Sequence, residues 1–599
     1  MKLIQQIASL AGLTPWGQYV CFPIIANPLP APAFIQWDCR CPYFIAPELT
    51  YIGYQDDIVF PAFQRLVDSL NSETFWTPLQ ARDEQHLVSR LDSGECSNEH
   101  ATVLRSVKVS ISDLEAELQY NVDESYSLDI NEETGIRIQA GTRFGALHAL
   151  TTLEQLILKL KSGQFVIEQG VTIRDKPLYS HRGVSVDTAR NFYPMETLLR
   201  QIDAMAMAKM NVLHWHMVDS ESWPLDLESL PEMSQAAFSE TERYTASDIK
   251  KIVRYAYQRG VRIIPEIDMP GHASLAWKYA DPNTVICDDL SYFDPPIGFV
   301  SPQLDVTYDG TYKLLEAVYN ELSQLFPDHH FHAGFDEMWT KCTDLSEKMQ
   351  RWLIDNNYTY ADIGQYYVNQ SMPIFKSVPN RTIIMWEDAV LGHTITAKDL
   401  PKDIVLQAWD GGLNSAKKLA NMGYDVIISA YDFLYLDCGK GQAMAGDPRY
   451  LQQEDPDPSR KEFSFNYRGD GGSWCAPYKT WQRLYSLDFH HTMTEVELSH
   501  VVGAEAALWS EQIDEMELDA IIWPRTGSLA ELLWSGNRDN EGYHRVSEFF
   551  PRLLYFRERL KSKGLRPASI GSRLCLRDPQ KCDLGLVGKN HRDLPSARD

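Results

Sequence analysis

The stretch HFHAGFDE, residues 330–337, contains the pattern on which this chain of 599 residues is built. A short apolar segment begins near His330 and ends in two adjacent carboxylates, Asp336 and Glu337. On its own, such a pair is also compatible with two solvated acids at the start of a loop. If both are buried, they repel each other, so that one retains its proton and can serve as a general acid. Cleavage of a glycosidic bond requires such an acid.

Seven other segments share this design, being short apolar runs that end in polar or aromatic residues. They begin near Gly183, Asn211, Arg262, Thr382, Asp403, Asp425 and Gly503. Residues at helical spacing lie between most of them, over 196–209, 247–259, 313–326 and 360–376. Strands that are apolar on both sides are typical of a parallel sheet covered by helices. Eight such units predict a (β/α)8 TIM barrel of the α/β class rather than a doubly wound sheet, because no glycine-rich phosphate loop follows any strand.

The chain before the barrel predicts a separate small α/β domain. Residues 125–130 alternate polar and apolar side chains, as a half-buried strand does, and residues 145–161 carry apolar residues at helical spacing. The predicted organisation is an N-terminal arm or weak signal segment, a small α/β domain, a catalytic barrel and a tail with a local cysteine pair, over residues 1–34, 35–175, 176–560 and 561–599.

Composition excludes some classes of function. A net charge of −26 argues against a nucleic-acid partner, whose phosphates would be repelled. No apolar run approaches the roughly 20 residues that span a bilayer. The cysteines at 438 and 475, and at 575 and 582, bracket local segments, as disulfides of an oxidising compartment do. Together with sequons at Asn357, Asn369 and Asn380, they predict a secretory-pathway protein, either extracellular or vacuolar/lysosomal.

A barrel places its catalytic groups at the C-terminal ends of its strands. The unusual residues of this chain are found at those positions: Asp187, His216, Asp219, Asp268, His272, Asp336, Glu337, Trp386, Trp409 and Glu511. A purely structural scaffold does not need acids, histidines and tryptophans at the ends of so many strands. His216 is the exception, since a hydrogen-bonded structural histidine is the simpler interpretation.

Several motifs carry a family resemblance from about residue 120 to 540. They are His181-Arg182-Gly183 with Asp187-Thr188-Ala189-Arg190, His214-Trp215-His216 with Asp219, Asp268-Met269-Pro270-Gly271-His272, the hexad 332–337, Trp386-Glu387 and Leu508-Trp509-Ser510-Glu511. In this order they resemble the β-N-acetylhexosaminidases of glycoside hydrolase family 20. The loop between Cys438 and Cys475 is similar to that of fungal members.

The resemblance implies a chemistry in which no enzyme carboxylate attacks the sugar. The 2-acetamido oxygen of the substrate attacks instead and forms an oxazolinium intermediate. Glu337 would protonate the glycosidic oxygen and later activate water, while a charged Asp336 would accept a hydrogen bond from the acetamido N–H. Asp219 and His272 would orient the acid, and Asp268 would support Asp336.

The resemblance also implies a set of substrate-binding residues, and it implies neither a metal nor an organic cofactor. Arg182 would donate a forked pair of hydrogen bonds to the 3- and 4-hydroxyls of the sugar, and Tyr435 would donate to the acetamido oxygen. The other expected contacts are the hydroxyl acceptors Asp437 and Glu511 and the aromatic walls Trp386, Trp409 and Trp509. Trp386 and Trp409 are also compatible with barrel-core aromatics. A homodimer is among the assemblies left open.

Two motifs depart from the family pattern, the second because Ala189-Arg190-Asn191 stands where Ser-Arg-His is usual. Phe335 replaces the second glycine that usually precedes the acid pair, which leaves the pocket size near the leaving group open, and Asn191 replaces a histidine near the pocket rim. The predicted function is an exo-β-N-acetylhexosaminidase that acts on chitooligosaccharides or glycoconjugates. The alternatives are a relative that releases disaccharides and a sugar-binding protein on an inactivated barrel.

Overall fold

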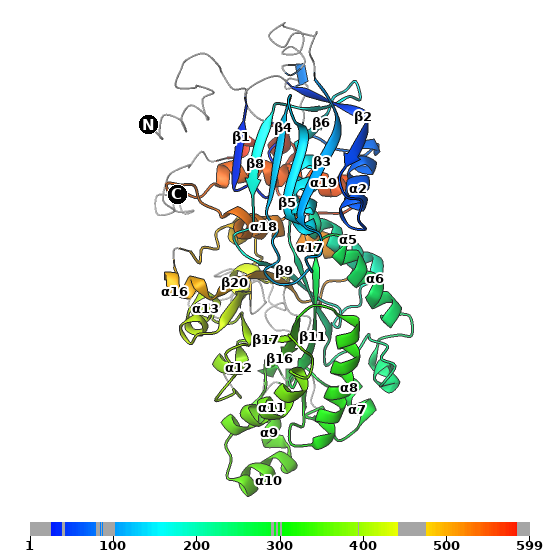
Figure 1. The fold of residues 1–599 in the computed structure, drawn as a ribbon. Coiled ribbons are helices and arrows are strands. Elements are labelled where there is room, and N and C mark those ends of the chain that lie inside the picture. The colour runs from blue at the N-terminus through cyan, green and yellow to red at the C-terminus, as the bar shows by residue number, and fades with distance from the viewer. Residues whose placement is uncertain are drawn as a thin grey trace, which may run out of the picture.

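The computed structural model describes residues 25–38, 42–78, 84–85, 87, 102–288, 293–294, 298–299, 302–392, 395–440, 475–490 and 492–583. Most of the predicted N-terminal arm, the interior of the loop between Cys438 and Cys475, and the end of the tail therefore lie outside the described residues. Figure 1 shows a sheet at one end of the molecule and a barrel surrounded by helices next to it.

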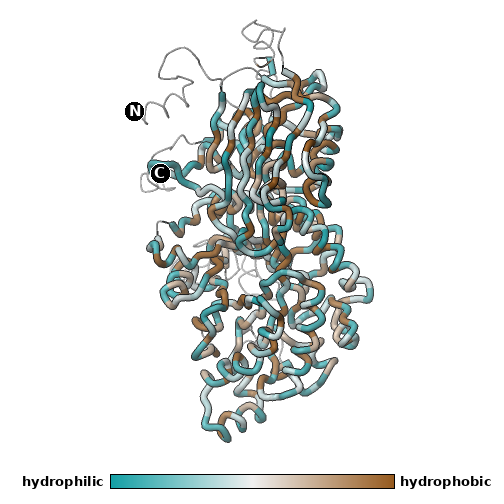
Figure 2. The backbone as a smooth tube through the Cα atoms, viewed as in Figure 1, coloured by the Kyte–Doolittle hydropathy of each residue, from teal (hydrophilic) through white to brown (hydrophobic). Residues whose placement is uncertain are grey.

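The first part of the chain forms an eight-stranded sheet in the order β1-β8-β4-β5-β3-β2-β7-β6. Its strands are β1 (Phe34–Trp37), β2 (Tyr43–Ile52), β3 (Val103–Asp113), β4 (Tyr126–Asn131), β5 (Gly135–Thr142), β6 (Ile157–Lys159), β7 (Phe165–Ile167) and β8 (Val171–Asp175). Helices α2 (Val59–Asn71) and α4 (Arg143–Leu156) share its core. Hydrophobic and hydrophilic residues alternate along β4 and β5, as Figure 2 shows for this sheet. The small α/β domain is confirmed as part of the fold.

The second part is a closed barrel of parallel strands in which β20 pairs with β9. Its strands are β9 (His181–Asp187), β10 (Val212–Val218), β11 (Arg262–Met269), β16 (His330–Gly334), β17 (Thr382–Trp386), β18 (Val405–Ala408), β19 (Asp425–Ile428) and β20 (Val501–Leu508). All eight coincide with the apolar segments read from the sequence. Because helices cover the barrel outside and side chains fill its interior, β9, β10 and β11 are buried along their whole length.

Helices connect the strands, and four of them match the ranges predicted from helical spacing. These are α5 (Met195–Met207), α6 (Ala246–Tyr257), α8 (Asp309–Leu325) and α11 (Tyr360–Phe375). The first turn of α6 is fixed by a capping box between Thr245 and Asp248, which satisfies two backbone N–H groups. The remaining helices are α7 (Leu275–Ala280), α9 (Thr340–Leu345), α10 (Glu347–Asn356), α12 (Asp388–Leu391), α13 (Gly412–Asn421), α14 (Tyr431–Leu434), α15 (Trp481–Tyr485), α16 (Glu495–Ser499), α17 (Leu518–Ile522), α18 (Thr526–Ser535), α19 (Val546–Ser562) and α20 (Arg573–Arg577).

Buried ion pairs join the first sheet to the amino end of the barrel. Lys209 Nζ lies 2.9 Å from Asp175 Oδ2, and neither side chain of this pair has any exposed surface. The ammonium group also lies 4.3 Å from the ring centroid of Trp534, a residue of α18 that belongs to the apolar core of the first sheet. A buried charge without a partner is costly, so Lys209 of the barrel and Asp175 of the first sheet stabilise each other.

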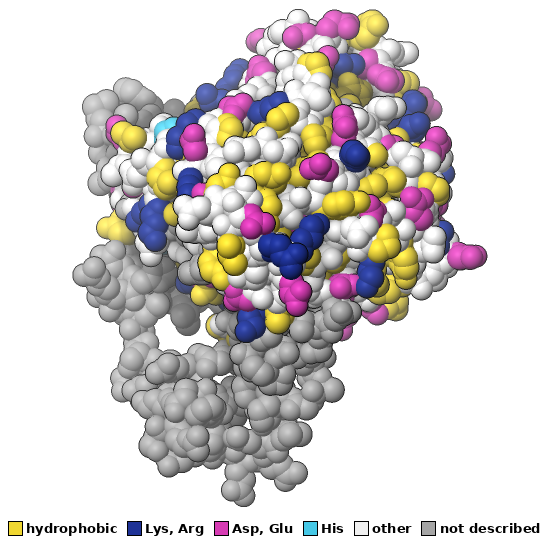
Figure 3. Space-filling model, turned by 90° about the horizontal axis from the view of Figure 1, so that it is seen from below, with side chains coloured by type: hydrophobic (Ala, Val, Ile, Leu, Met, Phe, Trp, Pro, Cys, Tyr) yellow, Lys and Arg dark blue, Asp and Glu magenta, His cyan; other side chains and the backbone are white. Residues whose placement is uncertain are grey.

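Three disulfides lie within the described residues: Cys287–Cys342, Cys438–Cys475 and Cys575–Cys582. The last two are the local pairs expected from the sequence. All three sequon asparagines are exposed, and Asn357 forms the left-handed C-cap of α10. On the face of the molecule that is seen from below in Figure 3, acidic, basic and apolar side chains are interspersed. Among the described residues, no helix has the length and apolar character needed to cross a membrane.

Candidate active site

Asp336 and Glu337 follow β16 in a stretch of backbone that departs from strand geometry. The φ angles of Gly334, Phe335 and Glu337 are 64°, 84° and 49°, which places all three in the left-handed region. Strict alternation along a strand would have pointed the two acids in opposite directions. The left-handed residues break that alternation, and both carboxylates approach the same histidine, His272.

Gly334 is required at this turn. A Cβ atom at this position would lie 1.8 Å from Asp268 Oδ1, in addition to the strain of a positive φ. Phe335, which departs from the family pattern, does not enter the pocket. Its fully buried ring lies 5.7 Å from the ring of Tyr367 on α11, and its backbone N–H donates to Met269 O. The ring of Phe335 thus packs on the helix side of the barrel wall.

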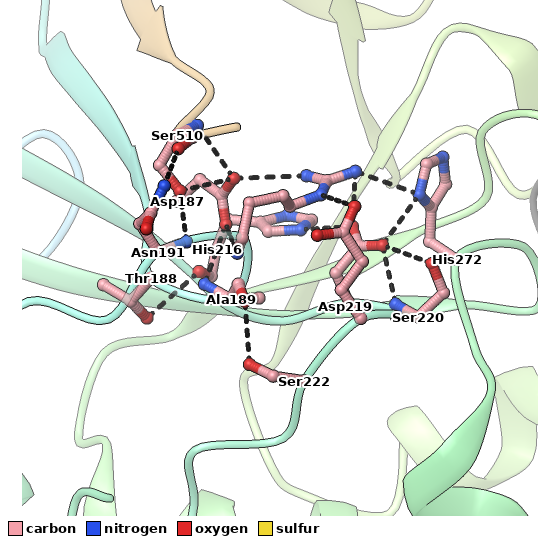
Figure 4. Close-up of polar contacts among 12 residues, drawn as sticks. Asp187, Thr188, Ala189, Asn191, His216, Asp219, Ser220, Ser222, His272 and Ser510 are labelled. Carbon is pink, nitrogen blue, oxygen red and sulfur yellow. Dashed lines mark hydrogen bonds and ion pairs between the residues drawn. The ribbon is translucent and has the colours of Figure 1, made fainter. Parts of the chain in front are cut away.

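A chain of hydrogen bonds leads from Glu337 into the barrel (Figure 4 shows its inner part). Glu337 Oε2 lies 3.1 Å from His272 Nε2, and His272 Nδ1 lies 3.2 Å from Asp219 Oδ1. Asp219 Oδ2 lies 2.9 Å from His216 Nε2 and 2.7 Å from Arg190 Nη2. Burial opposes a charge on His272, but the negative charges of Asp219 and Asp336 raise the pKa of its imidazole well above the ordinary value. His272 can therefore donate to Glu337.

The carboxyl that raises the pKa of Asp336 is that of Asp268, not that of its sequence neighbour Glu337. Burial, followed by the charge of Asp268, raises the pKa of Asp336 well above its ordinary value. Burial likewise raises the pKa of Asp268 to about 8, and the negative charge of Glu266 adds to the effect. Glu337 is not buried as deeply as either carboxyl. The carboxyl that raises the pKa of Asp336 is thus Asp268, which comes from β11 to the end of β16, rather than its sequence neighbour Glu337.

This pair gives a pH dependence of stability. Unfolded Asp titrates near pH 3.9, whereas folded Asp268 titrates near pH 8. Between these values the unfolded chain releases a proton that the native protein keeps, so the free energy of unfolding should fall as the pH rises. Urea unfolding of wild type and Asp268→Asn from about pH 5 to about pH 8 measures this, and the variant should show the shallower fall. Equal slopes would contradict the assignment.

Aromatic rings form a continuous wall beside the acids. The ring of Trp386 lies 5.9 Å from that of Trp509, which lies 6.0 Å from Tyr435. Tyr435 and Trp409 stack at 6.1 Å with an interplanar angle of 6°. Trp409 Nε1 donates to Asp388 Oδ2 at 2.7 Å, which fixes the indole orientation. The wall comes from the ends of β17, β18 and β20 and from the segment after α14, so four stretches of chain build one apolar surface.

Polar groups lie on the same segments as two rings of the wall, because Asp437 follows Tyr435 and Glu511 follows Trp509. Burial and the negative charge of Glu511 raise the pKa of Asp437 to about 7. Burial also raises the pKa of Glu511, although the charge of Arg190 opposes this shift. Arg190 Nη1 lies 3.3 Å from Asp187 Oδ2, and the positive charge of Arg190 also acts on Glu511. Asn191, the second departure from the family pattern, ties the β9 loop to the β20 loop because its backbone N–H donates to Ser510 Oγ at 2.9 Å.

The prediction that Arg182 contacts the sugar is wrong. Arg182 lies at the amino end of β9, fully buried beneath the barrel, where its guanidinium donates to both carboxylate oxygens of Glu124 at 2.9 and 2.6 Å. Arg190 follows Asp187 at the carboxyl end of the same strand and lies in the site. The barrel rule could have distinguished the two arginines, because only the second follows the C-terminal end of its strand.

Other residues around the site were missed by sequence reasoning. Glu221 follows β10 near Arg190, and burial raises its pKa to about 7. Potential metal ligands also gather beneath the pocket, where His214, Glu266 and His332 offer atoms within 4.8 Å of one another. His332 Nδ1 lies 2.8 Å from Glu266 Oε1, and His214 Nε2 lies 3.0 Å from Glu266 Oε2, so these groups already contact one another.

Comparisons with known proteins agree with this geometry. The family model described as "Glycosyl hydrolase family 20, catalytic domain" matches residues 179–537, and "beta-acetyl hexosaminidase like" matches residues 28–156. Beta-hexosaminidase 1 of Coccidioides posadasii is 41% identical over 588 residues, which cover 96% of this chain and 98% of the relative. A beta-hexosaminidase of Emericella nidulans is 43% identical over 577 residues, or 93% of this chain and 95% of the relative.

Solved structures show the same architecture. The chitobiase of Flavobacterium johnsoniae superposes with a TM-score of 0.67 at 27% identity, covering 90% of this chain and 73% of that one. The family match spans the whole barrel, including the strand ends that carry the acids, the histidine and the aromatic wall. The chain is thus a member of glycosyl hydrolase family 20.

Proposed function

We propose that this protein is an exo-acting β-N-acetylhexosaminidase that releases terminal N-acetylglucosamine, and also N-acetylgalactosamine, from the non-reducing ends of chitooligosaccharides or glycoconjugates. The observation that carries the proposal is the convergence of Asp336 and Glu337 on His272 beside the aromatic wall. One acid is connected to a relay of hydrogen bonds, while the other is paired with a second buried carboxyl. Two such different environments give two neighbouring acids separate tasks.

In the proposed reaction, Glu337 donates its proton to the glycosidic oxygen as the bond to C1 breaks. The acetamido oxygen of the substrate forms the new bond to C1, and Asp336 accepts a hydrogen bond from the acetamido N–H, which stabilises the developing positive charge. Tyr435 donates to the acetamido oxygen. Glu337 then removes a proton from water as the water oxygen bonds to C1 and the bond between C1 and the acetamido oxygen breaks, which restores the acetamido group and gives net retention.

Further contacts bind the sugar ring. Arg190, in place of Arg182, donates to the 3- and 4-hydroxyls from its position beside Asp187 and Asp219. Asp437 and Glu511 accept hydrogen bonds from hydroxyls on the far side of the ring. The walls that enclose the acetamido methyl group and the apolar face of the sugar are Trp386, Trp409 and Trp509.

The location proposed for the protein is the secretory pathway. The three disulfides and the exposure of Asn357, Asn369 and Asn380 support it, because disulfides persist in oxidising compartments and N-glycans need accessible asparagines. The Emericella nidulans and Arthroderma benhamiae relatives carry the names "Beta-hexosaminidase" and "Probable beta-hexosaminidase".

Product analysis on a defined oligomer tests the proposed activity. Incubation with chitotriose should release N-acetylglucosamine and chitobiose first and leave only monosaccharide at completion.

A stable thiazoline mimic of the oxazolinium ion should inhibit the enzyme, because the intermediate forms from the substrate itself. Accumulating chitobiose that is never cleaved would favour a disaccharide-releasing relative, and calorimetric binding without products would favour a sugar-binding barrel. A matching N-acetylgalactosaminide tests the second sugar.

A further inference from the structure

A layer of buried polar side chains crosses the barrel below the active site. It contains His181, His214, His216, Glu266, His332, Gln407 and Glu505, of which none is more than 2% exposed. Contacts between strands that are not neighbours, such as His214 Nδ1 to Glu505 Oε1 at 2.6 Å, place these side chains inside the barrel. Val212, Ile264 and Val405, which belong to one apolar cluster, lie two residues before His214, Glu266 and Gln407 on the same strands. The proposed chemistry uses none of the carboxylates in this polar layer.

Glu266 is the centre of this layer. Its Oε2 atom accepts from His216 Nδ1 at 2.6 Å and lies 3.0 Å from His214 Nε2. Its Oε1 atom accepts from the indole Nε1 of Trp386 at 2.8 Å. Since side chains two residues apart on a strand share a face, Glu266 lies directly below Asp268 on β11.

Two branches run upward from this one carboxylate. The first passes through His216 to Asp219 and then to His272, which contacts the general acid Glu337. The second ends at Trp386, whose ring packs against Trp509 in the aromatic wall. Each branch is continuous in hydrogen bonds or ring contacts, so that one ends at the general acid and the other at the aromatic wall.

We propose that Glu266 is a positioning residue that holds the general acid and the acetamide-binding wall in one fixed geometry. This inference rests on the function proposed above and adds a residue to it. A rigid link between the two walls keeps the proton donor aligned with the glycosidic oxygen while the acetamido oxygen is held for attack on C1. Effects of this kind are large, because a displacement of about 1 Å of a catalytic group can cost about 10²-fold in rate.

Charges along the first branch alternate in sign. Burial opposes a charge on His216, but Glu266 and Asp219 raise the pKa of its imidazole to about 10. Similarly, Glu505 and Glu266 raise the pKa of His214 to about 9 against the effect of burial. Burial would raise the pKa of Glu266, yet the charges of these histidines and of His332 hold it well below its ordinary value. Both oxygens of Glu266 accept hydrogen bonds from buried donors, whereas the side-chain amide of glutamine has only one acceptor oxygen.

The test compares Glu266→Gln with Glu505→Gln. Glu505 is equally buried in the same layer but contacts His181, His214 and Gln407 instead of His216 and Trp386. Glu266→Gln should lower kcat/KM for chitobiose by about 10²-fold and, because Trp386 also loses its acceptor, raise KM. The loss should be smaller for an activated 2,4-dinitrophenyl N-acetylglucosaminide, whose leaving group needs little protonation. Glu505→Gln should lower the Tm about as much as Glu266→Gln does. Its effect on kcat/KM should be the same for chitobiose and for the dinitrophenyl glycoside.

A second readout does not require turnover. The short contact between His216 Nδ1 and Glu266 should give a low-field proton resonance in wild type. Loss of this resonance in His216→Gln assigns it. It should also be absent in Glu266→Gln. The proposal would be overturned if kcat/KM fell equally in Glu266→Gln and Glu505→Gln, or if it did not fall in Glu266→Gln. Persistence of the low-field resonance in Glu266→Gln would also overturn it. If wild type itself cleaves no N-acetylhexosaminide, the proposed function fails, whereas the resonance still decides whether Glu266 holds His216.

Discussion

Replacing Glu337 by glutamine should lower kcat/KM for chitobiose by about 10²–10⁴-fold, the range typical for loss of a general acid. Glutamine keeps the shape of the side chain and the contact with His272 Nε2 on one side, but it has no proton to give to the glycosidic oxygen. The measurement is the initial rate of N-acetylglucosamine release by wild type and variant across substrate concentrations.

The leaving group separates acid catalysis from simple damage to the fold. A 2,4-dinitrophenolate departs without protonation, so Glu337→Gln should affect kcat/KM for that glycoside far less than for chitobiose. A nearby control is Glu221→Gln, which lies on the β10 loop beside Arg190 rather than on the relay to the acid. Equal losses for both leaving groups, or turnover of chitobiose comparable to that of wild type, would remove Glu337 from the role of acid.

Replacing Asp336 by asparagine should lower kcat/KM by about 10²–10³-fold, as expected when one stabilising partner of a developing charge is lost. Asparagine keeps an acceptor for the acetamido N–H, but it cannot lose a proton and so cannot supply a negative charge as the oxazolinium ion forms. The loss should appear with both leaving groups, in contrast to that of Glu337→Gln. Affinity for the thiazoline mimic, measured by inhibition, should fall in parallel with kcat/KM.

Asp336→Asn should be more stable than wild type although it is less active. The native protein keeps Asp336 protonated near pH 8 because its pKa is raised, whereas the unfolded chain ionises it, so an asparagine that does not titrate should raise the free energy of unfolding. Active sites commonly retain such destabilising groups for the sake of function. Denaturation of Asp336→Asn beside wild type measures this, and a variant that is both inactive and less stable would argue that Asp336 supports the fold instead of the reaction.

The eight barrel strands were predictable from sequence because their burial on both sides produces short apolar runs with little ambiguity. Asp336, Glu337, His272 and Asp219 were predictable as a group for a similar reason, since the topology brings the carboxyl ends of all strands to one edge. Spacing alone could not show that Gly334 and Phe335 turn the backbone into the left-handed region, which lets both acids face the pocket.

Other features depend on contacts between strands that are distant in the sequence. The carboxyl that raises the pKa of Asp336 belongs to Asp268, 68 positions earlier, so attention to the neighbour Glu337 could not find it. Glu266 and Glu505 were overlooked because they lie inside segments that were read as apolar. A carboxylate in the middle of such a run is itself a signal, because it must meet a buried partner in the barrel.

The buried ion pairs beneath the barrel have a consequence for how such proteins can be recombined. Lys209 and Arg182 belong to the barrel, whereas the carboxylates that neutralise them, Asp175 and Glu124, lie on the other side of the domain border. The barrel is thus not an interchangeable cassette. A chimaera that joins the barrel to a different first domain must supply an acid near Lys209 and another near Arg182. Without them, these two side chains would be buried positive charges without partners, far from the active site.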